Sequence, residues 1–335
     1  MTNTIRVRLP ASLDSLTPDT VEPRQPGPGE VLFKVRASSL NFHDYAVVAG
    51  LIKTADGRIP MSDGAGDVIA VGEGVTEFKP GDKVLSTFFT DWPDGICESK
   101  DFTTVPGDGM DGYATEFATV PAQALTRYPN SYSYEEAATL TCAGVTAWRA
   151  LMTNGQLKAG ETVLVQGSGG VSVFALQLAK MAGAKVIATS SSDEKLERLG
   201  ALGADHLINY KKTPNWGEAA AKLSGGGVDH VVEIGGPGTL PQSIHAIRNG
   251  GHIALIGVLT GWEGVVPTAL LMRKQGRLIG LTVGSRRDQL DLVRACEVNG
   301  MRPVIDRSFP LQELGDAFRY QLSGAHLGKI CLQVS

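Results

Sequence analysis

A glycine-rich turn between an apolar strand and an apolar helix is the most informative chemical feature of this 335-residue chain. The predicted strand Thr162–Gln166 runs directly into this turn, and a helix is expected from Val171. Glycines let a backbone turn tightly and approach a pyrophosphate, and a helix N-terminus presents N–H groups to phosphate oxygens. Since the turn stands between a strand and a helix, it predicts a dinucleotide site made by Gly167, Ser168, Gly169, Gly170 and Val171. Ser172 replaces the third glycine of the usual pattern and is small enough for close packing of helix and strand.

The end of the next predicted strand bears on which nicotinamide cofactor is bound. An NAD site normally has an acidic residue about twenty residues after the glycine turn, where it binds the ribose 2′-hydroxyl. This chain has Ser190 and Ser191 at that place, so no carboxylate would repel a 2′-phosphate. Lys195 adds a positive charge nearby, although alone it would be interpreted as a solvated helix residue. We therefore expect NADPH, with NADH less favoured.

The elements around the turn alternate between strands and helices, which is typical of a doubly wound parallel sheet. Helical spacing predicts helices over Tyr134–Met152, Val171–Ala182, Asp193–Leu202 and Trp216–Leu223, with Asp193 or Ser192 as a cap. Six apolar strands are predicted, over Thr162–Gln166, Lys185–Ser190, His206–Asn209, Val228–Ile234, His252–Gly257 and Leu278–Val283. The fold class is therefore α/β with a Rossmann sheet.

The flanking parts of the chain predict a second, largely β domain. Short strands broken by Gly and Pro are predicted over Val31–Ala37, Val68–Val71, Lys83–Thr87 and Tyr113–Val120, and together they suggest a barrel. A polar segment, Thr90–Asp111, is expected to be a long loop. Beyond Arg286 the chain predicts a helix, the strand Val304–Phe309, a helix near Leu311–Leu322 and the strand Lys329–Val334, and we expect this tail to return to the first domain.

Composition excludes several classes of protein. A net charge of -4 without a long basic tract argues against nucleic-acid binding. No window approaches the ~18 uninterrupted apolar residues of a membrane span, and the first ten residues do not resemble a signal peptide. The four cysteines, Cys97, Cys142, Cys296 and Cys331, lack paired spacing and are expected to be thiols. We therefore expect a cytoplasmic protein with no membrane partner.

Several short motifs, taken in their order and spacing, resemble the medium-chain dehydrogenase/reductase superfamily and in particular its zinc-free quinone oxidoreductase branch. The resemblance covers nearly the whole chain. Besides the glycine turn, the motifs are Asn41-Phe42-His43-Asp44, Asp63-Gly64-Ala65-Gly66, Phe78-Lys79-Pro80-Gly81-Asp82-Lys83-Val84, Ala143-Gly144-Val145-Thr146-Ala147-Trp148, Leu202-Gly203-Ala204-Asp205, Ile208-Asn209-Tyr210 and Gly328-Lys329.

The resemblance implies a domain arrangement and a set of site residues. A GroES-like β-barrel catalytic domain would be made by residues 1–127 and 285–335, with the Rossmann domain, 128–284, between them. Ser190, Lys195 and Tyr210 would surround the 2′-phosphate, and Asn41 and Thr146 would lie near the nicotinamide. The remaining residues assigned to the cofactor are Gly257, Val258, Leu259, Val283, Gly284, Ser285 and Lys329.

The same comparison bears on metal binding. Zinc-bearing relatives have a cysteine at the position of Asn41 and a histidine at that of Ser62, and a catalytic zinc needs three protein ligands. The structural zinc of the family uses four close cysteines, whereas Thr90–Asp111 contains only Cys97. The six histidines show no i, i+4 pairing, so each is expected on the surface or in the core. We predict no metal site.

Without a metal ion, electrophilic acceptors are the expected substrates. Quinones and α,β-unsaturated carbonyl compounds need only a positioned hydride and a proton. Asn41, Asp44 and Tyr45 are the candidate catalytic residues. Tyr45, Asp44 and His43 are candidates for hydrogen bonding or proton delivery, although Asp44 could equally form a structural ion pair and Tyr45 a wall of the site.

Two other classes remain open: a zinc-type alcohol dehydrogenase-like enzyme acting on alcohols or aldehydes, and a non-enzymatic NADPH-binding relative. The ligand positions argue against the first, and the presence of Asn41 argues against the second. An apolar edge strand at Leu278–Val283 further predicts a homodimer, because a partner strand would cover it.

Overall fold

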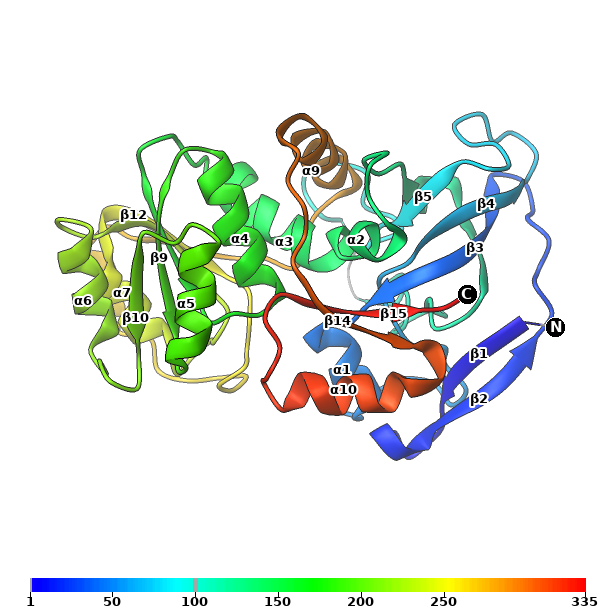
Figure 1. Cartoon of the computed structure of the whole chain (residues 1–335), viewed down its shortest axis with the longest axis horizontal. Helices are drawn as coiled ribbons and strands as arrows, with labels where there is room; N and C mark the ends of the chain where they lie inside the picture. Colours follow the sequence, from blue (N-terminus) through cyan, green and yellow to red (C-terminus); the bar gives the residue numbers. More distant parts are fainter. Residues whose placement is uncertain (1, 99–101) are drawn as a thin grey trace. The chain divides into compact units, whose positions relative to one another are not determined.

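The computed structural model describes residues 2–98 and 102–335, and the chain forms two compact units (Figure 1). The split unit comprises Met1–Val145 and Gly284–Ser335, and the central unit comprises Thr146–Val283. The domains predicted from the sequence were residues 1–127 with 285–335 and residues 128–284. In the structure residues 128–145 lie with the split unit. Residues 99–101 of the predicted long loop lie outside the described residues.

Within the described residues, the central unit contains the predicted parallel sheet of six strands. The strand order is β10-β9-β8-β11-β12-β13, which is the order 3-2-1-4-5-6 of a doubly wound sheet. Both faces of such a sheet are covered, so β8 is buried along its whole length. The strands are β8 (Thr162–Gln166), β9 (Lys185–Ser190), β10 (His206–Asn209), β11 (Val228–Glu233), β12 (Ile247–Leu255) and β13 (Arg277–Gly280).

Helices cover this sheet and supply the rest of its core. The helices α4 (Gly170–Met181) and α5 (Asp193–Ala201) pack against β8, β9 and β10. The helices α6 (Trp216–Leu223) and α7 (Leu240–Ala246) pack against each other and against β12. Neither α7 nor the short α8 (Thr268–Arg273) was predicted from the sequence. Ser192 is the N-cap of α5, as one of the two alternatives predicted.

The single long helix predicted over Tyr134–Met152 is wrong in detail. The segment is helical but is divided into α2 (Tyr134–Ala138), a π-turn η3 (Leu140–Gly144), α3 (Val145–Trp148) and a second π-turn η4 (Arg149–Thr153). The amides of Gly144 and Asn154 each bond to a carbonyl five residues earlier, which inserts an extra residue into the turn. Helical spacing cannot reveal such insertions because the buried face stays continuous.

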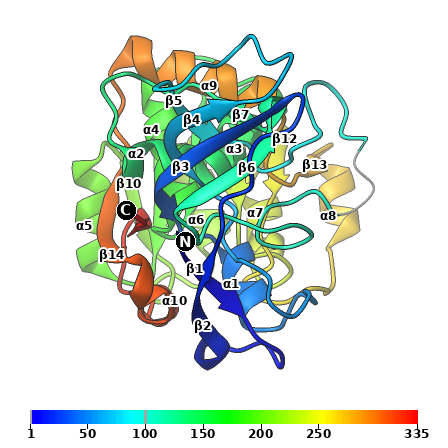
Figure 2. The ribbon, with the colours of Figure 1, turned by 90° about the vertical axis from the view of Figure 1, so that its right-hand side faces the viewer.

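The split unit is built on mostly antiparallel strands (Figure 2). In the described residues its larger sheet has the order β14-β15-β3-β4-β5-β7, and β6 pairs with β3. Its strands are β3 (Glu30–Ser39), β4 (Ala65–Val71), β5 (Lys83–Ser86), β6 (Phe117–Pro121), β7 (Leu125–Thr126), β14 (Ile305–Pro310) and β15 (Lys329–Gln333). The C-terminal strand β15 pairs with β3, so the tail returns to the first part of the chain as predicted.

Several elements of the split unit were not predicted. A separate hairpin is formed by β1 (Thr2–Val7) and β2 (Leu16–Val21), and the helix α1 (Phe42–Val48) follows β3. Three short 3-10 turns, η1 (Leu13–Ser15), η2 (Ala122–Ala124) and η5 (Leu311–Glu313), were not predicted either. The two C-terminal helices, α9 (Arg286–Asn299) and α10 (Leu314–Leu322), lie where the sequence predicted helices.

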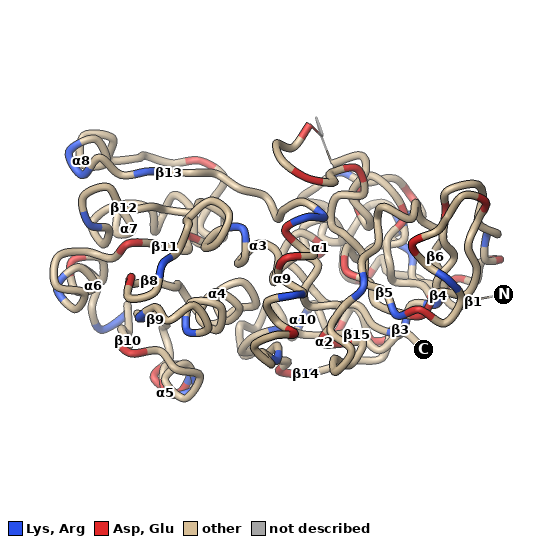
Figure 3. Tube along the Cα trace, turned by 90° about the horizontal axis from the view of Figure 1, so that it is seen from above, with Lys and Arg blue, Asp and Glu red and all other residues tan. Residues whose placement is uncertain are grey.

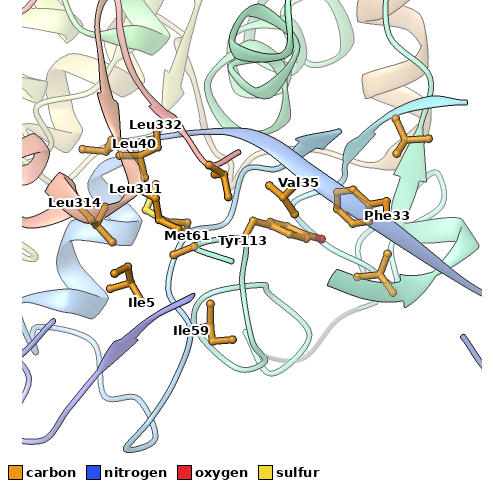
Figure 4. Packing of buried hydrophobic residues seen from close by; sticks show 14 of the residues in the cluster. Ile5, Phe33, Val35, Leu40, Ile59, Met61, Tyr113, Leu311, Leu314 and Leu332 are labelled. Carbon is orange, nitrogen blue, oxygen red and sulfur yellow. The ribbon is translucent and has the colours of Figure 1, made fainter. Parts of the chain in front are cut away.

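The core of the split unit draws residues from segments that are far apart in sequence. In Figure 4 Met61 lies beside Leu40, Leu311 and Leu332, and the ring of Tyr113 lies between Met61 and Val35. Each fully buried side chain of this size stabilises the fold by about 2 kcal/mol relative to an exposed one. Lysines and arginines are interspersed with acidic residues along the chain (Figure 3). Among the described residues, no helix is long and apolar enough to span a membrane.

Candidate functional site

The predicted glycine turn joins β8 to α4 in the geometry that phosphate binding needs. Gly167 has a φ of 72°, a backbone conformation that favours glycine, and its amide donates to the carbonyl of Thr189 at 2.8 Å. Gly169 is the N-cap of α4, and no side chain caps this helix. A Cβ atom added at Gly169 would meet nothing within 4 Å. The first N–H groups of α4 have no intrahelical partner, and the space beside Gly169 is open, so this turn suits a phosphate.

Ser172 takes over the packing role of the missing third glycine. Its side chain is buried in the first turn of α4, and its Oγ donates to the carbonyl oxygen of Gln166 at 2.6 Å. The bond ties the start of the helix to the last residue of β8. Ser172 therefore adds a hydrogen bond that a glycine at this position could not make.

A buried carboxylate that sequence reasoning missed lies beside this turn. Glu233 ends β11, is fully buried, and accepts five hydrogen bonds within the described residues. Gln166, which precedes the glycine turn, donates to its Oε2 at 2.7 Å. The other donors are the amides of Gly235 and Gly236 and the hydroxyls of Thr239 and Ser243. The sequence signal that could have identified Glu233 was an acidic residue near the end of an apolar strand, shortly before the two glycines Gly235 and Gly236.

The residues predicted to select the cofactor gather at one end of the sheet. Ser190 on β9 is the register partner of Asn209 on β10, and its carbonyl accepts from the amide of Tyr210 at 3.1 Å. Ser190 Oγ accepts from the amide of Ser192, which in turn caps α5 at Lys195. The structure therefore brings Ser190, Tyr210 and Lys195 together.

An acidic residue near this group, Asp193, is paired with a neighbouring lysine. Asp193 accepts from Asn209 at 2.7 Å and pairs with Lys212 at 2.5 Å. These two donors lower the pKa of Asp193. The carboxylate nearest to Ser190 in the chain is thus already paired with a cation. This pair was not predicted from the sequence.

The other predicted cofactor residues are distributed over both units. Gly257 lies so close to the Ile234 carbonyl that a Cβ would be 1.9 Å from its oxygen, which explains the glycine. Thr146 is buried in α3, and Ser191, Val258 and Leu259 lie in the loops after β9 and β12. Val283 has a φ of 48° at the end of the central unit. In the split unit, Gly284 precedes Ser285, whose hydroxyl accepts from the amide of Asp288 as the N-cap of α9.

A cluster of buried polar side chains surrounds Asn41 in the split unit. Asn41 is 7% exposed and lies between β3 and α1. Its Oδ1 accepts from Lys329 Nζ at 2.6 Å, while its Nδ2 donates to Ser62 Oγ at 3.3 Å and to the Ser39 carbonyl at 3.4 Å. Lys329 is 3% exposed and also donates to the Leu40 carbonyl at 2.6 Å. The amide of Asn41 is therefore held at both ends.

Asp63 adds a second charge to this cluster. It is fully buried, accepts from Ser39 Oγ at 2.5 Å, and lies 3.8 Å from Lys329 Nζ. Burial raises the pKa of Asp63 to about 6, and the positive charge of Lys329 opposes this shift. Lys329, which was assigned to the cofactor, thus directs its ammonium group at Asn41, Leu40 and Asp63; its contact with a cofactor stays a prediction.

The two other candidate catalytic residues are engaged by the fold. Asp44 is buried, and its oxygens accept from the amides of Asn41 at 2.9 Å and Ser62 at 2.8 Å. Tyr45 is partly buried, with its ring 6.3 Å from that of Phe318 and packed on the core of the unit. Their predicted part in proton delivery remains untested, but Asp44 plainly fixes the start of α1.

No group of three histidine, cysteine, aspartate or glutamate side chains that could hold a metal ion occurs in residues 2–98 and 102–335. The Asn41 amide donates to the Ser62 hydroxyl and accepts from Lys329. The expectation of a zinc-free protein stays a prediction.

Comparison with known proteins identifies two matching family models. The model of the alcohol dehydrogenase GroES-like domain matches residues 27–130, and the model described as zinc-binding dehydrogenase matches residues 170–297. The first covers β3 to β7 of the split unit, and the second includes most of the central unit.

Three curated relatives match this chain along almost their whole length. A zinc-type alcohol dehydrogenase-like protein of Schizosaccharomyces pombe is 44% identical over 97% of this chain and 96% of its own. An acryloyl-coenzyme A reductase of Metallosphaera sedula is 30% identical, with 93% of this chain and 94% of its own covered. A chloroplastic quinone oxidoreductase of Triphysaria versicolor is 32% identical, with 92% and 91% covered.

Two solved structures also match this chain over almost its whole length. A putative alcohol dehydrogenase from Sinorhizobium meliloti superposes with a TM-score of 0.93 at 38% identity, over 99% of this chain and 98% of its own. A crotonyl-CoA carboxylase/reductase in complex with NADP superposes with a TM-score of 0.87 at 26% identity, over 99% and 94%.

Proposed function

This chain belongs to the medium-chain dehydrogenase/reductase superfamily of oxidoreductases, and we propose that it transfers hydride from NADPH to a quinone or an α,β-unsaturated carbonyl compound without zinc. The observation that carries the proposal is the Asn41 amide held between Lys329 and Ser62. An amide cannot ionise an alcohol, and a zinc ion would supply that chemistry in zinc-bearing members. Electrophilic acceptors do not need it.

The residues present in the central unit fit a nicotinamide dinucleotide. The open side of Gly169 and the uncapped N-terminus of α4 would take the pyrophosphate. Ser190, Lys195 and Tyr210 would take the 2′-phosphate, with no free carboxylate among them. When bound, NADPH supplies the hydride; the chain positions it and excludes water. A structural neighbour that contains NADP supports this choice of cofactor.

Two relatives support the choice of acceptor. One is named for the reduction of acryloyl-coenzyme A, a conjugated thioester, and another is named a quinone oxidoreductase. Both names describe compounds in which a carbonyl group activates a carbon–carbon double bond. The name of a third relative, a zinc-type alcohol dehydrogenase-like protein, suggests alcohols as the alternative substrates, so the test must include them.

Turnover with three classes of substrate tests the proposal. Purified protein is mixed with NADPH and a quinone, with NADPH and a conjugated enone, and with NADP and a saturated primary alcohol. NADPH oxidation is expected with at least one of the first two and no NADP reduction with the third. Vigorous alcohol oxidation without quinone or enone activity would overturn the proposed chemistry.

Elemental analysis by mass spectrometry tests the absence of zinc separately. Protein purified without chelators should contain far less than one zinc per chain, since Asn41 and Ser62 replace two of the ligands. One or two zinc ions per chain would refute this part of the proposal.

We also propose a homodimer that forms through β13. This strand lies at an edge of the six-stranded sheet in the described residues, although it is shorter than predicted and ends at Gly280. Trp262 and Met272, in the segment between β12 and β13, are 66% and 75% exposed, and an uncovered apolar edge is an aggregation hazard. Light scattering at micromolar concentration should give twice the mass of one chain; the mass of a monomer would contradict it.

A further inference from the structure

An aspartate and a lysine pair at the end of the sheet where the cofactor-selecting residues gather. Asp193 is the first residue of α5, and Lys212 lies three residues after the end of β10. The helix α5 packs against β9 and β10, which are parallel neighbours (Figure 1). Lys212 Nζ donates to one oxygen of Asp193, and Asn209 Nδ2 donates to the other at 2.7 Å. Both carboxylate oxygens of Asp193 are therefore engaged by residues at or after the end of β10.

This Asp193–Lys212 pair lies next to the predicted 2′-phosphate site. Asn209, which donates to Asp193, is the register partner of Ser190 on the adjoining strand. Neighbouring strands are about 4.8 Å apart, so a single residue separates the Asp193 carboxylate from Ser190. The residue after Asn209, Tyr210, donates its amide to the Ser190 carbonyl at 3.1 Å. All of these residues belong to the central unit, so their arrangement is fixed within one compact body.

Both side chains of the pair are open to solvent and so to a dissolved cofactor. The side chain of Lys212 is 70% exposed and that of Asp193 is 56% exposed. An ion pair this exposed contributes little to the stability of a fold, because water solvates both of its charges. A carboxylate in the first turn of a helix is favourable by itself, so α5 does not need Lys212. The position of the pair beside Ser190 therefore indicates a role in binding.

The pair determines what Asp193 presents to a bound nucleotide. The hydrogen bonds from Lys212 and then from Asn209 lower the pKa of Asp193, so the carboxylate is ionised at neutral pH. An ionised carboxylate without a cation beside it repels a 2′-phosphate. It also accepts a hydrogen bond from a ribose hydroxyl, which is how acidic residues at this end of the sheet favour NADH. With Lys212 in place, the pair has no net charge and the oxygens of Asp193 are already taken.

We propose that Lys212 determines cofactor specificity by neutralising Asp193, and this proposal rests on the proposed function. Asp193 is an acid of the kind that an NAD site uses, placed three residues after Ser190. Because Lys212 and Asn209 engage both of its oxygens, the ribose of NADH finds no acceptor there and the phosphate of NADPH meets no net negative charge. Preference for NADPH thus depends on Lys212 as well as on the serine at position 190.

The affinities for both cofactors in Lys212→Met test the proposal. Each cofactor is titrated by its fluorescence at low ionic strength. The substitution should weaken NADPH binding at least about tenfold, because the uncompensated Asp193 charge repels the phosphate. It should strengthen NADH binding at least about threefold, because Asp193 gains a ribose hydroxyl as its partner. A misfolded protein would not bind NADH more tightly, so the second result also shows that the variant is intact.

Three further variants show whether Asp193 is responsible. Adding Asp193→Asn to Lys212→Met removes the released charge, so both affinities should return to within about threefold of those of the unmutated protein. Adding Glu194→Gln instead neutralises the neighbouring acid of α5 and should leave both shifts in place. Lys211→Met is the matched control for the lysine, because it removes an equal charge from the adjacent position without releasing Asp193. It should not strengthen NADH binding.

The outcomes separate the two levels of proposal. If the unmutated protein does not prefer NADPH to NADH, the cofactor of the proposed function is wrong. If it prefers NADPH but Lys212→Met does not strengthen NADH binding, Asp193 is not released onto the ribose and the inference fails. It also fails if the variant with Asp193→Asn binds NADPH as weakly as Lys212→Met alone, because Lys212 then acts on the phosphate directly. Recovery with Glu194→Gln would show a general charge effect and would equally overturn it.

Discussion

A buried pair of histidines in the central unit predicts that this protein loses stability in mild acid. His230 on β11 and His252 on β12 are register partners, and their Nδ1 atoms are 3.4 Å apart. His230 Nε2 lies 3.0 Å from Glu161, whereas His252 Nε2 has no hydrogen-bond partner among the described residues. Burial lowers the pKa of His252 to about 4, and the charges of His230 and Arg277 add to the effect.

The sign and size of the effect follow from proton linkage. The folded-state pKa of His252 lies below its ordinary value of 6.5, so as pH falls the unfolded chain is protonated first. This contribution to the free energy of unfolding is fully present above about pH 6.5, decreases as pH falls from there to about 4, and then levels off. Between about pH 7 and about pH 5 the loss from this group amounts to about 2 kcal/mol.

Urea unfolding at these two pH values measures the effect. Tryptophan fluorescence reports the transition, because Trp216 is buried in the same unit. His252→Gln cannot titrate, so its free energy of unfolding should fall by about 2 kcal/mol less than that of the unmutated protein. Comparing the two differences cancels the titration of carboxylates common to both proteins. His206→Gln should show the full loss. Equal losses in the unmutated protein and in His252→Gln would refute the reasoning.

Three further substitutions test the predicted site. Ser190→Asp should weaken NADPH binding at least about tenfold by like-charge repulsion and favour NADH; titration of cofactor fluorescence decides, and equal affinities for both cofactors in the unmutated protein would contradict the prediction. Asn41→Ala should lower kcat about 100-fold and leave NADPH affinity within about threefold of the unmutated protein, because it removes a positioning contact. Steady-state kinetics with a quinone or enone acceptor measures this, and an unchanged kcat would contradict it. Lys329→Met should reduce the free energy of unfolding by about 3 kcal/mol, because Asp63 and Asn41 lose a buried cation; a value equal to that of the unmutated protein in urea unfolding would count against it.

The alternating elements of the central unit could be predicted because their signals are local. The strands β8, β9 and β10 and the helix α6 have the predicted bounds, since each is a buried apolar run or an amphipathic stretch between breakers. The hairpin of β1 and β2 could not be found in this way. Pro18 lies within the second strand and disfavours that prediction, whereas in the fold the strand is stabilised by pairing with residues near the N-terminus. The π-turns at Gly144 and Asn154 leave no periodic signal either.

The candidate site was predictable where a short motif marks it. The glycine turn and Ser190 were found from position alone, and the structure gives them the expected surroundings. Lys329 was found only by resemblance, and its partner Asn41 is 288 residues away in the chain. Gln166 and Glu233 are 67 residues apart, and nothing in their neighbourhoods pairs them. Side chains that meet through tertiary packing carry no spacing signal in a single sequence.

Two buried carboxylates, Glu233 and Asp63, show what such contacts do for the site. Removing a carboxylate from water costs several kcal/mol, and apolar replacements of buried charges are often stabilising, so stability alone does not explain either residue. Glu233 accepts from Gln166, the residue before the glycine turn, and from the amides of the loop after β11. Asp63 lies against the ammonium group that holds the Asn41 amide. We infer that Glu233 fixes the residue before the glycine turn, and that Asp63 fixes Lys329 and through it the Asn41 amide. The motif residues are recognisable because their chemistry is local, whereas the residues that hold them in place become visible only in the folded chain.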